Sequence, residues 1–141
     1  MIREYEDKDL RELLEAWYSA SKFAHPFLSE EFFNQERQKI PSIYMPMAET
    51  WVYELDGAVV GFIALIGNEV GAIFLDPELH GKGIGRALMD HARSIRDVLE
   101  LDVFKDNTIG RNFYKKYGFI EEYEYLHKET GFMQLRLKLT Y

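Results

Sequence analysis

The sequence predicts a single α/β domain with a mixed sheet flanked by helices, and three observations support this prediction. The chain has 141 residues, a usual length for one domain. In its second half, a glycine-rich segment separates a β-branched run from a run with helical periodicity, which is typical of a strand, a tight turn and a helix. Near the C-terminus, apolar and polar residues alternate strictly, which predicts a half-buried strand.

The first expected helix spans residues 8–24. Asp7 precedes it and is expected to cap it, and Pro26 ends it because the residue before a proline disfavours helical backbone. The apolar residues recur at i, i+3, i+4 and i+7, the spacing of one helix face, at Leu10, Leu13, Leu14 and Trp17. A second helix should begin after Ser29, whose hydroxyl can cap it, and the two prolines Pro41 and Pro46 should interrupt it before the next strand.

A hairpin is predicted next, with strands at 50–55 and 58–66 joined by the turn signal Asp56-Gly57. Gly67-Asn68 offers another turn before a strand over residues 70–75.

The glycine-rich turn after this strand leads into a helix from Ile84 and then a strand over residues 99–104. A strand–helix–strand unit of this kind predicts two parallel strands with a right-handed crossover. Asn107 should open a last helix that stops by Gly118, and residues 133–139 form the alternating strand.

Composition excludes several classes of function. The formal net charge is -7 and no block of Lys or Arg interrupts the acidic balance, so nucleic acid is not expected as a partner. The chain has no cysteine, which excludes disulfides, cysteine metal sites and a cysteine nucleophile. The N-terminus lacks an apolar signal core and the longest apolar run, Ala58–Ile66, is too short to span a membrane. We therefore expect no membrane partner and a cytoplasmic location.

The glycine-rich segment is the first candidate functional motif. It reads HGKGIGR over residues 80–86, and such a turn at a helix N-terminus directs several backbone N–H groups at one point, which suits a pyrophosphate. A Walker A loop would need Ser or Thr after Lys82, where Gly83 stands. A dinucleotide-binding loop would need G-x-G-x-x-G near the first strand. A tight turn with no ligand is the remaining alternative.

The second motif lies at residues 107–119 and reads NTIGRNFYKKYGF. Together, the two motifs resemble the GNAT superfamily of N-acetyltransferases. Its cofactor loop reads (Arg/Gln)-x-x-Gly-x-(Gly/Ala), and its next helix reads Asn-x-x-Ala-x-x-x-Tyr-x-x-x-Gly-Phe. The resemblance extends over essentially the whole chain and implies a GNAT fold, in which the two parallel strands splay apart. The sequence departs from the pattern at His80, in the Arg/Gln position, and at Gly110, in the Ala position.

The resemblance implies acetyl-CoA as the acetyl donor, with no metal. Backbone groups at Ile73, Phe74 and Leu75 would bind the pantetheine arm, together with the side chain of Asn107, which is also a favoured helix cap. Tyr114 matches the tyrosine that protonates the departing CoA thiolate. The residues that would bind the pyrophosphate are His80, Gly81, Lys82, Gly83, Ile84, Gly85 and Arg86.

The chemistry of these residues is consistent with acyl transfer. A tyrosine with a pKa near 10 keeps its proton at neutral pH, and a thiol pKa near 8.5 makes proton donation to a nascent thiolate feasible. An alkylammonium must first lose a proton. Glu69 begins the strand before the loop, at a spacing like that of the catalytic glutamate of histone-acetylating relatives. An ordered water and the loop residue His25 are the alternative proton acceptors.

The expected function is therefore direct transfer of acetyl from acetyl-CoA to a primary amine, which is either a protein lysine or N-terminus or a small amine. The acidic balance, with Glu121, Glu122 and Glu124 after the second motif, favours a cationic acceptor. Residues 25–28, between the first two helices, would shape the acceptor site. The aromatic side chains that could line it are Trp17, Phe23, Phe27, Phe32 and Phe33. We expect a monomer or a homodimer. The alternatives are a catalytically weak CoA-binding or regulatory module of the same fold and a nucleotide-phosphate enzyme that uses the same loop.

Overall fold

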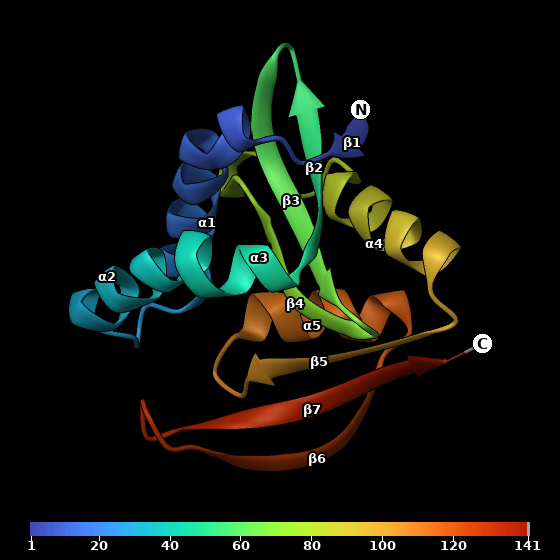
Figure 1. The fold of residues 1–141 in the computed structure, drawn as a ribbon. Helices are drawn as coiled ribbons and strands as arrows, with labels where there is room; N and C mark the ends of the chain where they lie inside the picture. Colours follow the sequence, from blue (N-terminus) through green and yellow to red (C-terminus); the bar gives the residue numbers. More distant parts are fainter. Residues whose placement is uncertain (141) are drawn as a thin grey trace.

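The computed structural model describes residues 1–140 and confirms a mixed sheet flanked by helices (Figure 1). Within these residues, seven strands lie in the order β1-β2-β3-β4-β5-β7-β6, and every neighbouring pair is antiparallel except β4 and β5. The strands are β1 (Ile2–Glu4), β2 (Glu49–Leu55), β3 (Ala58–Ile66), β4 (Glu69–Leu75), β5 (Val98–Phe104), β6 (Ile120–His127) and β7 (Phe132–Thr140).

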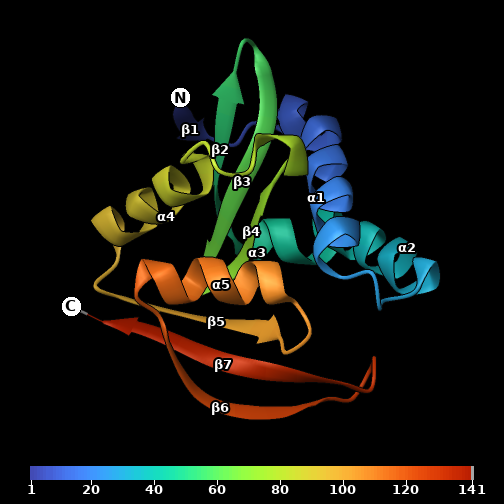
Figure 2. The same ribbon diagram turned by 180° about the vertical axis from the view of Figure 1, so that it is seen from behind.

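Helices cover both faces of the strands β2–β4, with α1 on one side and α4 on the other (Figure 1). From behind, α5 is seen alongside β5, between α4 and the C-terminal hairpin (Figure 2). None of the helices formed by residues 1–140 has the length and apolar character that a membrane span requires. The helices are α1 (Leu10–Ala24), α2 (Glu30–Lys39), α3 (Met45–Met47), α4 (Ile84–Ile95) and α5 (Thr108–Tyr117), with short helical turns η1 (Asp7–Asp9), η2 (Ile40–Tyr44) and η3 (Pro77–Leu79).

The start of α1 differs from the prediction, because Asp7 does not cap it. Asp7 lies in the turn η1, and it is the carboxylate of Asp9 that accepts the backbone N–H of Glu6 at 2.8 Å. Arg3 binds the same carboxylate through both terminal nitrogens, at 2.8 and 2.9 Å, and this ion pair holds the pKa of Asp9 below its usual range. Asp9 thus links β1 to the turn η1, and no side chain caps α1.

The second helix begins as predicted, since the hydroxyl of Ser29 accepts the backbone N–H of Phe32 at 3.1 Å. Its end differs in one respect. The helix α2 stops at Lys39, but the chain stays helical through η2 and α3. Pro41 and Pro46 each stand at the first turn of a new helical segment, where the missing N–H of proline has no bond to lose.

The strands β4 and β5 diverge, as the resemblance implied. They are parallel, and their register contains one aligned pair, Glu69 with Glu100. By contrast, β4 pairs with β3 along its whole length, and β5 pairs with β7 from Val98 to Phe104. An opening therefore lies between the C-terminal halves of β4 and β5.

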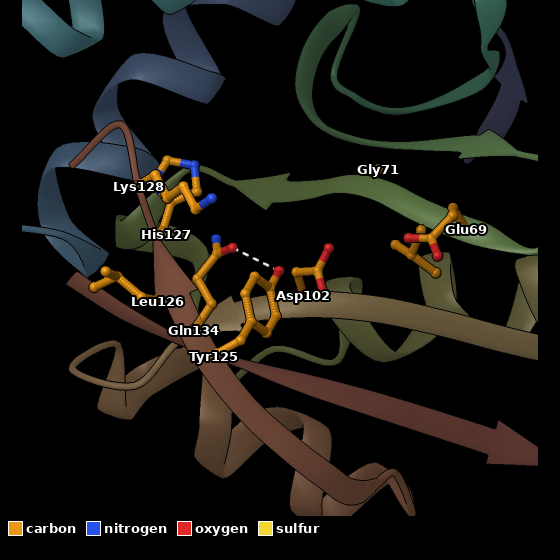
Figure 3. A pocket seen from close by; sticks show the side chains of 9 residues that line it. Glu69, Gly71, Asp102, Tyr125, Leu126, His127, Lys128 and Gln134 are labelled. Carbon is orange, nitrogen blue, oxygen red and sulfur yellow. Dashed lines mark hydrogen bonds between the residues drawn. The ribbon is translucent and has the colours of Figure 1, made fainter. Parts of the chain in front are cut away.

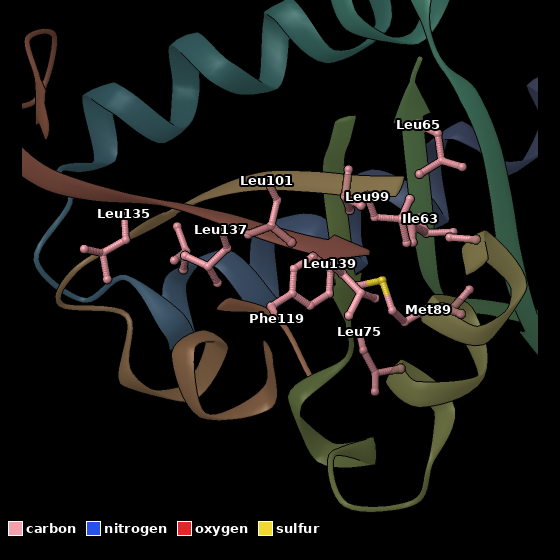
Figure 4. Packing of buried hydrophobic residues seen from close by; sticks show 14 of the residues in the cluster. Ile63, Leu65, Leu75, Met89, Leu99, Leu101, Phe119, Leu135, Leu137 and Leu139 are labelled. Atoms are coloured by element: carbon pink, nitrogen blue, oxygen red, sulfur yellow. The ribbon is translucent and has the colours of Figure 1, made fainter. Parts of the chain in front are cut away.

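Two hydrophobic clusters fix the walls of this opening. The first lies between the sheet and α4 and includes Leu88 and Met89 with Leu99, Leu101 and Leu137 of β5 and β7 (Figure 4). The second lies under α1 and is built by Leu13, Trp17, Val52, Phe62 and Phe104. Because successive strand residues point to opposite faces, both faces of the sheet contribute to the core.

Candidate active site

A cavity of about 1130 Å³ occupies the opening between β4 and β5. It is bounded by β4, β5, α1, α5 and the glycine-rich loop, so two motifs that lie far apart in the sequence meet around one space. The residues of the predicted cofactor site that line it are Ile73, Phe74, Leu75, His80, Gly81, Gly83, Ile84, Gly85, Arg86, Asn107 and Tyr114. Lys82 is exposed and is not among the lining residues.

The loop has the backbone geometry of an anion cradle. Gly81 and Gly83 have φ of 82° and 84°, the left-handed region that favours glycine, and no atom lies within 4 Å of a Cβ built at either. No side chain caps α4, and the first bond of the helix runs from Ala87 N–H to the Gly83 carbonyl at 3.0 Å. The N–H groups of residues 84–86 therefore remain free for an anion.

The edge of β4 offers backbone groups to the cavity. Asp76 donates its N–H to the carbonyl oxygen of Val60 on β3 at 2.9 Å. Along a strand, the N–H and C=O groups of successive residues point to opposite sides. The polar groups of Phe74 therefore face β3, whereas those of Ile73 and Leu75 face the opening. The Phe74 side chain still forms part of the wall and lies 5.9 Å from the ring of Phe62.

Tyr114 lies on the face of α5 that lines the cavity. Its ring packs against Phe113 and Phe119, at centroid distances of 5.5 and 5.6 Å, which orients the side chain. Burial raises the pKa of the Tyr114 hydroxyl well above its usual value, so the group keeps its proton at neutral pH. Among residues 1–140, no hydrogen-bond partner is found for this hydroxyl, which leaves it available to a ligand.

Asn107 caps α5 as the sequence predicted. Its Oδ1 accepts the backbone N–H of Gly110 at 2.8 Å, and its Nδ2 lies 3.2 Å from Nε2 of His25. The side chain is 7% exposed and lines the cavity. Gly110 stands where the helix motif has alanine. A Cβ at this position would lie 2.6 Å from Asn107 Nδ2, so the amide as placed here leaves no room for an alanine side chain.

Glu69 lies outside the cavity, in an adjoining groove of about 550 Å³ (Figure 3). Its carboxylate is ion-paired with Arg136, which also contacts Glu100 at 3.5 Å and Asp102 at 3.3 Å. The groove and the cavity share part of their lining, namely Val70, Gly71, Asp102, His127 and Gln134. The groove and the cavity that Tyr114 lines therefore adjoin along this shared wall.

Sequence reasoning missed three polar residues of this shared wall: Asp102, His127 and Gln134. Alternation in the run Leu99-Glu-Leu-Asp-Val could have placed Asp102 on the face opposite the core. The positions of His127 and Gln134 depend on the pairing of β6 with β7, for which the sequence carries no local signal. Figure 3 shows Gln134 bound to Tyr125, whose hydroxyl donates to Gln134 Oε1 at 2.7 Å.

The expected aromatic wall of the acceptor site is only partly present. Trp17 and Phe32 line the cavity, and so do His25 and Leu28. The remaining aromatic candidates lie elsewhere. Phe27 packs on Phe104 and Phe132, Phe33 is buried in the cluster under α1, and Phe23 is exposed and contacts the ring of His80 at 5.8 Å.

The acidic cluster after α5 lies away from the cavity lining. Glu121 pairs with Arg111 at 3.1 Å and Glu124 with Lys105 at 3.0 Å, so two of its three charges are compensated. In the described residues 1–140, no group of three or more His, Asp or Glu side chains is arranged to hold a metal ion.

Comparisons with known proteins agree with this geometry. Residues 46–121 match the family model for the acetyltransferase (GNAT) domain. The peptidyl-lysine N-acetyltransferases YiaC and YjaB of Escherichia coli are 32% and 36% identical to this chain, each over 120 residues, which is 84% of this chain and 82% and 80% of those proteins.

Solved structures agree as well. The solution structure of apo YjaB from E. coli superposes with a TM-score of 0.86, at 30% identity over 98% of this chain and 95% of that one. The PaiA N-acetyltransferase of Thermoplasma acidophilum, solved with coenzyme A, has the same fold, with a TM-score of 0.80 and 24% identity over 100% and 98% of the two chains. These matches show that the chain belongs to the GNAT family of acetyltransferases.

Proposed function

We propose that this N-acetyltransferase transfers acetyl from acetyl-CoA to the ε-amino group of a lysine side chain in a protein or peptide. Acetyl transfer to an amine is the activity of its family. The choice of lysine is supported by one feature of the structure: the cavity adjoins a groove that is lined by the carboxylates of Glu69 and Asp102, both of which are ion-paired with Arg136. A relative at 32% identity, YiaC, is named a peptidyl-lysine N-acetyltransferase.

The proposed orientation of the donor follows from the elements that line the cavity. The pyrophosphate lies at the N-terminus of α4, where the free N–H groups of residues 84–86 bind it with Arg86. The pantetheine arm follows the edge of β4 and bonds to the backbone groups of Ile73 and Leu75 as an added strand would. This places the thioester near Asn107 and Tyr114, which line the same cavity.

The amine then attacks the thioester directly, since the chain has no cysteine to carry the acetyl group. The nitrogen lone pair forms a bond to the carbonyl carbon, and N–H groups at the edge of β4 stabilise the oxyanion. As the carbon–sulfur bond breaks, the Tyr114 hydroxyl donates its proton to the thiolate. The nitrogen of the tetrahedral intermediate then loses its extra proton, and this proton restores the Tyr114 hydroxyl. The products are free CoA and an acetylated amine.

A proton must leave the alkylammonium before attack, because its pKa near 10.4 keeps it protonated at neutral pH. Glu69 is the proposed base, with an ordered water as the alternative. The carboxylate lines the groove but not the cavity, and Arg136 holds it in place. An amine entering through the groove passes Glu69 before it reaches the thioester, so the proton can be removed on entry.

A panel of peptides tests the acceptor. One peptide has a blocked N-terminus and a single lysine, a second has a free N-terminus and no lysine, and a polyamine serves as the small-molecule acceptor. Release of CoA thiol and mass spectrometry should show acetylation of the lysine peptide at the highest kcat/KM. Preference for either of the other two would refute the lysine proposal. CoA binding without thiol release from any acceptor would instead indicate a non-catalytic module.

We also propose a cytoplasmic location, where acetyl-CoA is found.

A further inference from the structure

A buried polar network joins α1 to α5 across the cavity. The ring of His25, at the end of α1, lies with Nδ1 3.2 Å from Ser21 Oγ and Nε2 3.2 Å from Asn107 Nδ2. Asn107 Oδ1 in turn accepts the N–H of Gly110 at 2.8 Å. Ser21, His25 and Asn107 are 5%, 8% and 7% exposed, so water competes little for these bonds.

The direction of each hydrogen bond follows from the backbone. The Gly110 N–H can only donate, so the atom of Asn107 that faces it must be the carbonyl oxygen. The amide nitrogen of Asn107 therefore faces His25, and Nε2 of the imidazole must accept. A neutral imidazole then carries its proton on Nδ1, which donates to Ser21 Oγ.

His25 is held in this state by its surroundings. Burial lowers its pKa to about 4, so the ring stays neutral at physiological pH. Its ring also packs edge-on against Phe104 and Phe27, at centroid distances of 5.3 and 5.8 Å. Because its one lone pair is already occupied by Asn107, His25 does not serve as the base for the amine.

We propose that His25 is a positioning residue for acetyl-CoA: it fixes the amide of Asn107, which caps α5 and faces the donor. This inference rests on the cofactor role proposed for Asn107. The bonds to Gly110 and His25 use one lone pair and one N–H of the amide, which leaves one of each for the pantetheine arm. Without His25, the amide could rotate and lose this alignment.

Gly110 belongs to the same arrangement. A Cβ there would approach Asn107 Nδ2 to 2.6 Å, closer than real Cβ contacts, and its Cγ to 3.0 Å, which is tighter than most of them. An alanine would therefore push the amide out of the position that His25 holds. The backbone of Gly110 is helical, so the substitution itself introduces no strain at that residue.

A set of substitutions at His25 tests the proposal through the dissociation constant of CoA, measured by calorimetry without an amine. His25→Phe keeps the packed ring but removes the acceptor, whereas His25→Gln removes the ring but can place an acceptor near Asn107. We expect His25→Phe to weaken CoA binding about tenfold and His25→Gln to restore most of it. In kinetics, His25→Phe should raise KM for acetyl-CoA more than it lowers kcat. Wild-type affinity in a folded His25→Phe protein would overturn the proposal.

Double substitutions show whether His25 acts through Asn107. Adding His25→Phe to Asn107→Ala should cause no further loss of CoA affinity, because the amide to be positioned is already gone. Gly110→Ala should weaken binding in the wild type but not in Asn107→Ala. If His25→Phe does not fold, the comparison of Gly110→Ala in these two backgrounds still tests whether the position of the Asn107 amide controls CoA binding. Additive losses in both backgrounds would assign His25 and Gly110 a merely structural role. None of these outcomes depends on the acceptor, so the lysine proposal stands or fails separately.

Discussion

The carboxylate of Glu69 on β4 is held by the guanidinium of Arg136 on β7, across the intervening strand β5. Arg136 also contacts Glu100 and Asp102 of β5, so one positive charge is shared by three carboxylates. The side chain of Arg136 is 16% exposed, and it links the strands next to the point where β4 and β5 diverge. The cluster keeps a net negative charge beside the cavity, which favours a cationic acceptor.

Glu69→Gln tests the base. If Glu69 removes the proton, the substitution lowers kcat/KM at neutral pH by about 10²- to 10⁴-fold. The pH–rate profile also shifts upward, because the reaction then depends on amine that has already lost its proton in solution. Glu100→Gln is the matched control, since Glu100 contacts the same guanidinium but does not line the groove. An unshifted profile in Glu69→Gln would assign proton removal to water.

Tyr114→Phe tests the acid. The substitution keeps the ring that packs on Phe113 and Phe119 and removes only the proton donor. We expect kcat to fall about 10²- to 10⁴-fold while the affinity for CoA changes little. Because burial raises the pKa of Tyr114, its ionisation should not limit the wild-type rate at or below pH 10. Tyr123→Phe, at a side chain that is 58% exposed on β6, serves as the control. Full turnover in Tyr114→Phe would exclude the acid role.

The sequence was a good guide to the fold because most of its signals are local. The turn at Asp56-Gly57 lies where predicted, and the strand expected at 70–75 is found as Glu69–Leu75. The prediction was wrong at Asp7, because a short helical turn, η1, precedes α1 and contains Asp7, and no side chain caps α1.

In the site too, local motifs could be recognised from the sequence, whereas contacts between distant residues could not. The glycine-rich loop and Tyr114 belong to contiguous motifs, so the resemblance could assign them. His25 and Asn107 are 82 residues apart, and Glu69 and Arg136 are 67 apart. Both contacts form only when α1 meets α5 and when β7 inserts between β5 and β6, and no local spacing encodes either event. These two contacts depend on the tertiary structure, which the local sequence pattern does not reveal.

Gly83→Val tests the anion cradle. Its φ of 84° is unfavourable for a β-branched residue, and the side chain would occupy the open space that a pyrophosphate needs. Gly57→Val is the matched control, because Gly57 has a φ of 83° and open surroundings in the β2–β3 turn. Both variants should lose about 1–3 kcal/mol of stability from backbone strain. Only Gly83→Val should lose CoA affinity in calorimetry, and equal affinity in the two proteins would contradict the assignment.

The last prediction concerns stability against pH. The folded protein holds His25 neutral with a pKa of about 4, whereas the unfolded chain should titrate near 6.5. The unfolded state therefore binds a proton that the folded state does not, as the pH falls from 6.5 to 4. Stability from this group is fully present above pH 6.5 and declines below it, by about 3 kcal/mol in total. Between pH 7 and pH 5, the loss should be about 2 kcal/mol.

The measurement is the free energy of unfolding by urea at several pH values, for the wild type and for His25→Gln. Other groups also destabilise the fold in acid, including Asp9, whose pKa is held low by Arg3. These contributions are common to both proteins, so the difference in slope reports His25 alone. The glutamine has no titrating group, so the variant should lose less stability between pH 7 and pH 5. Parallel curves would mean that the pKa of His25 is the same in the folded and the unfolded protein, which would contradict a neutral ring that is held by burial.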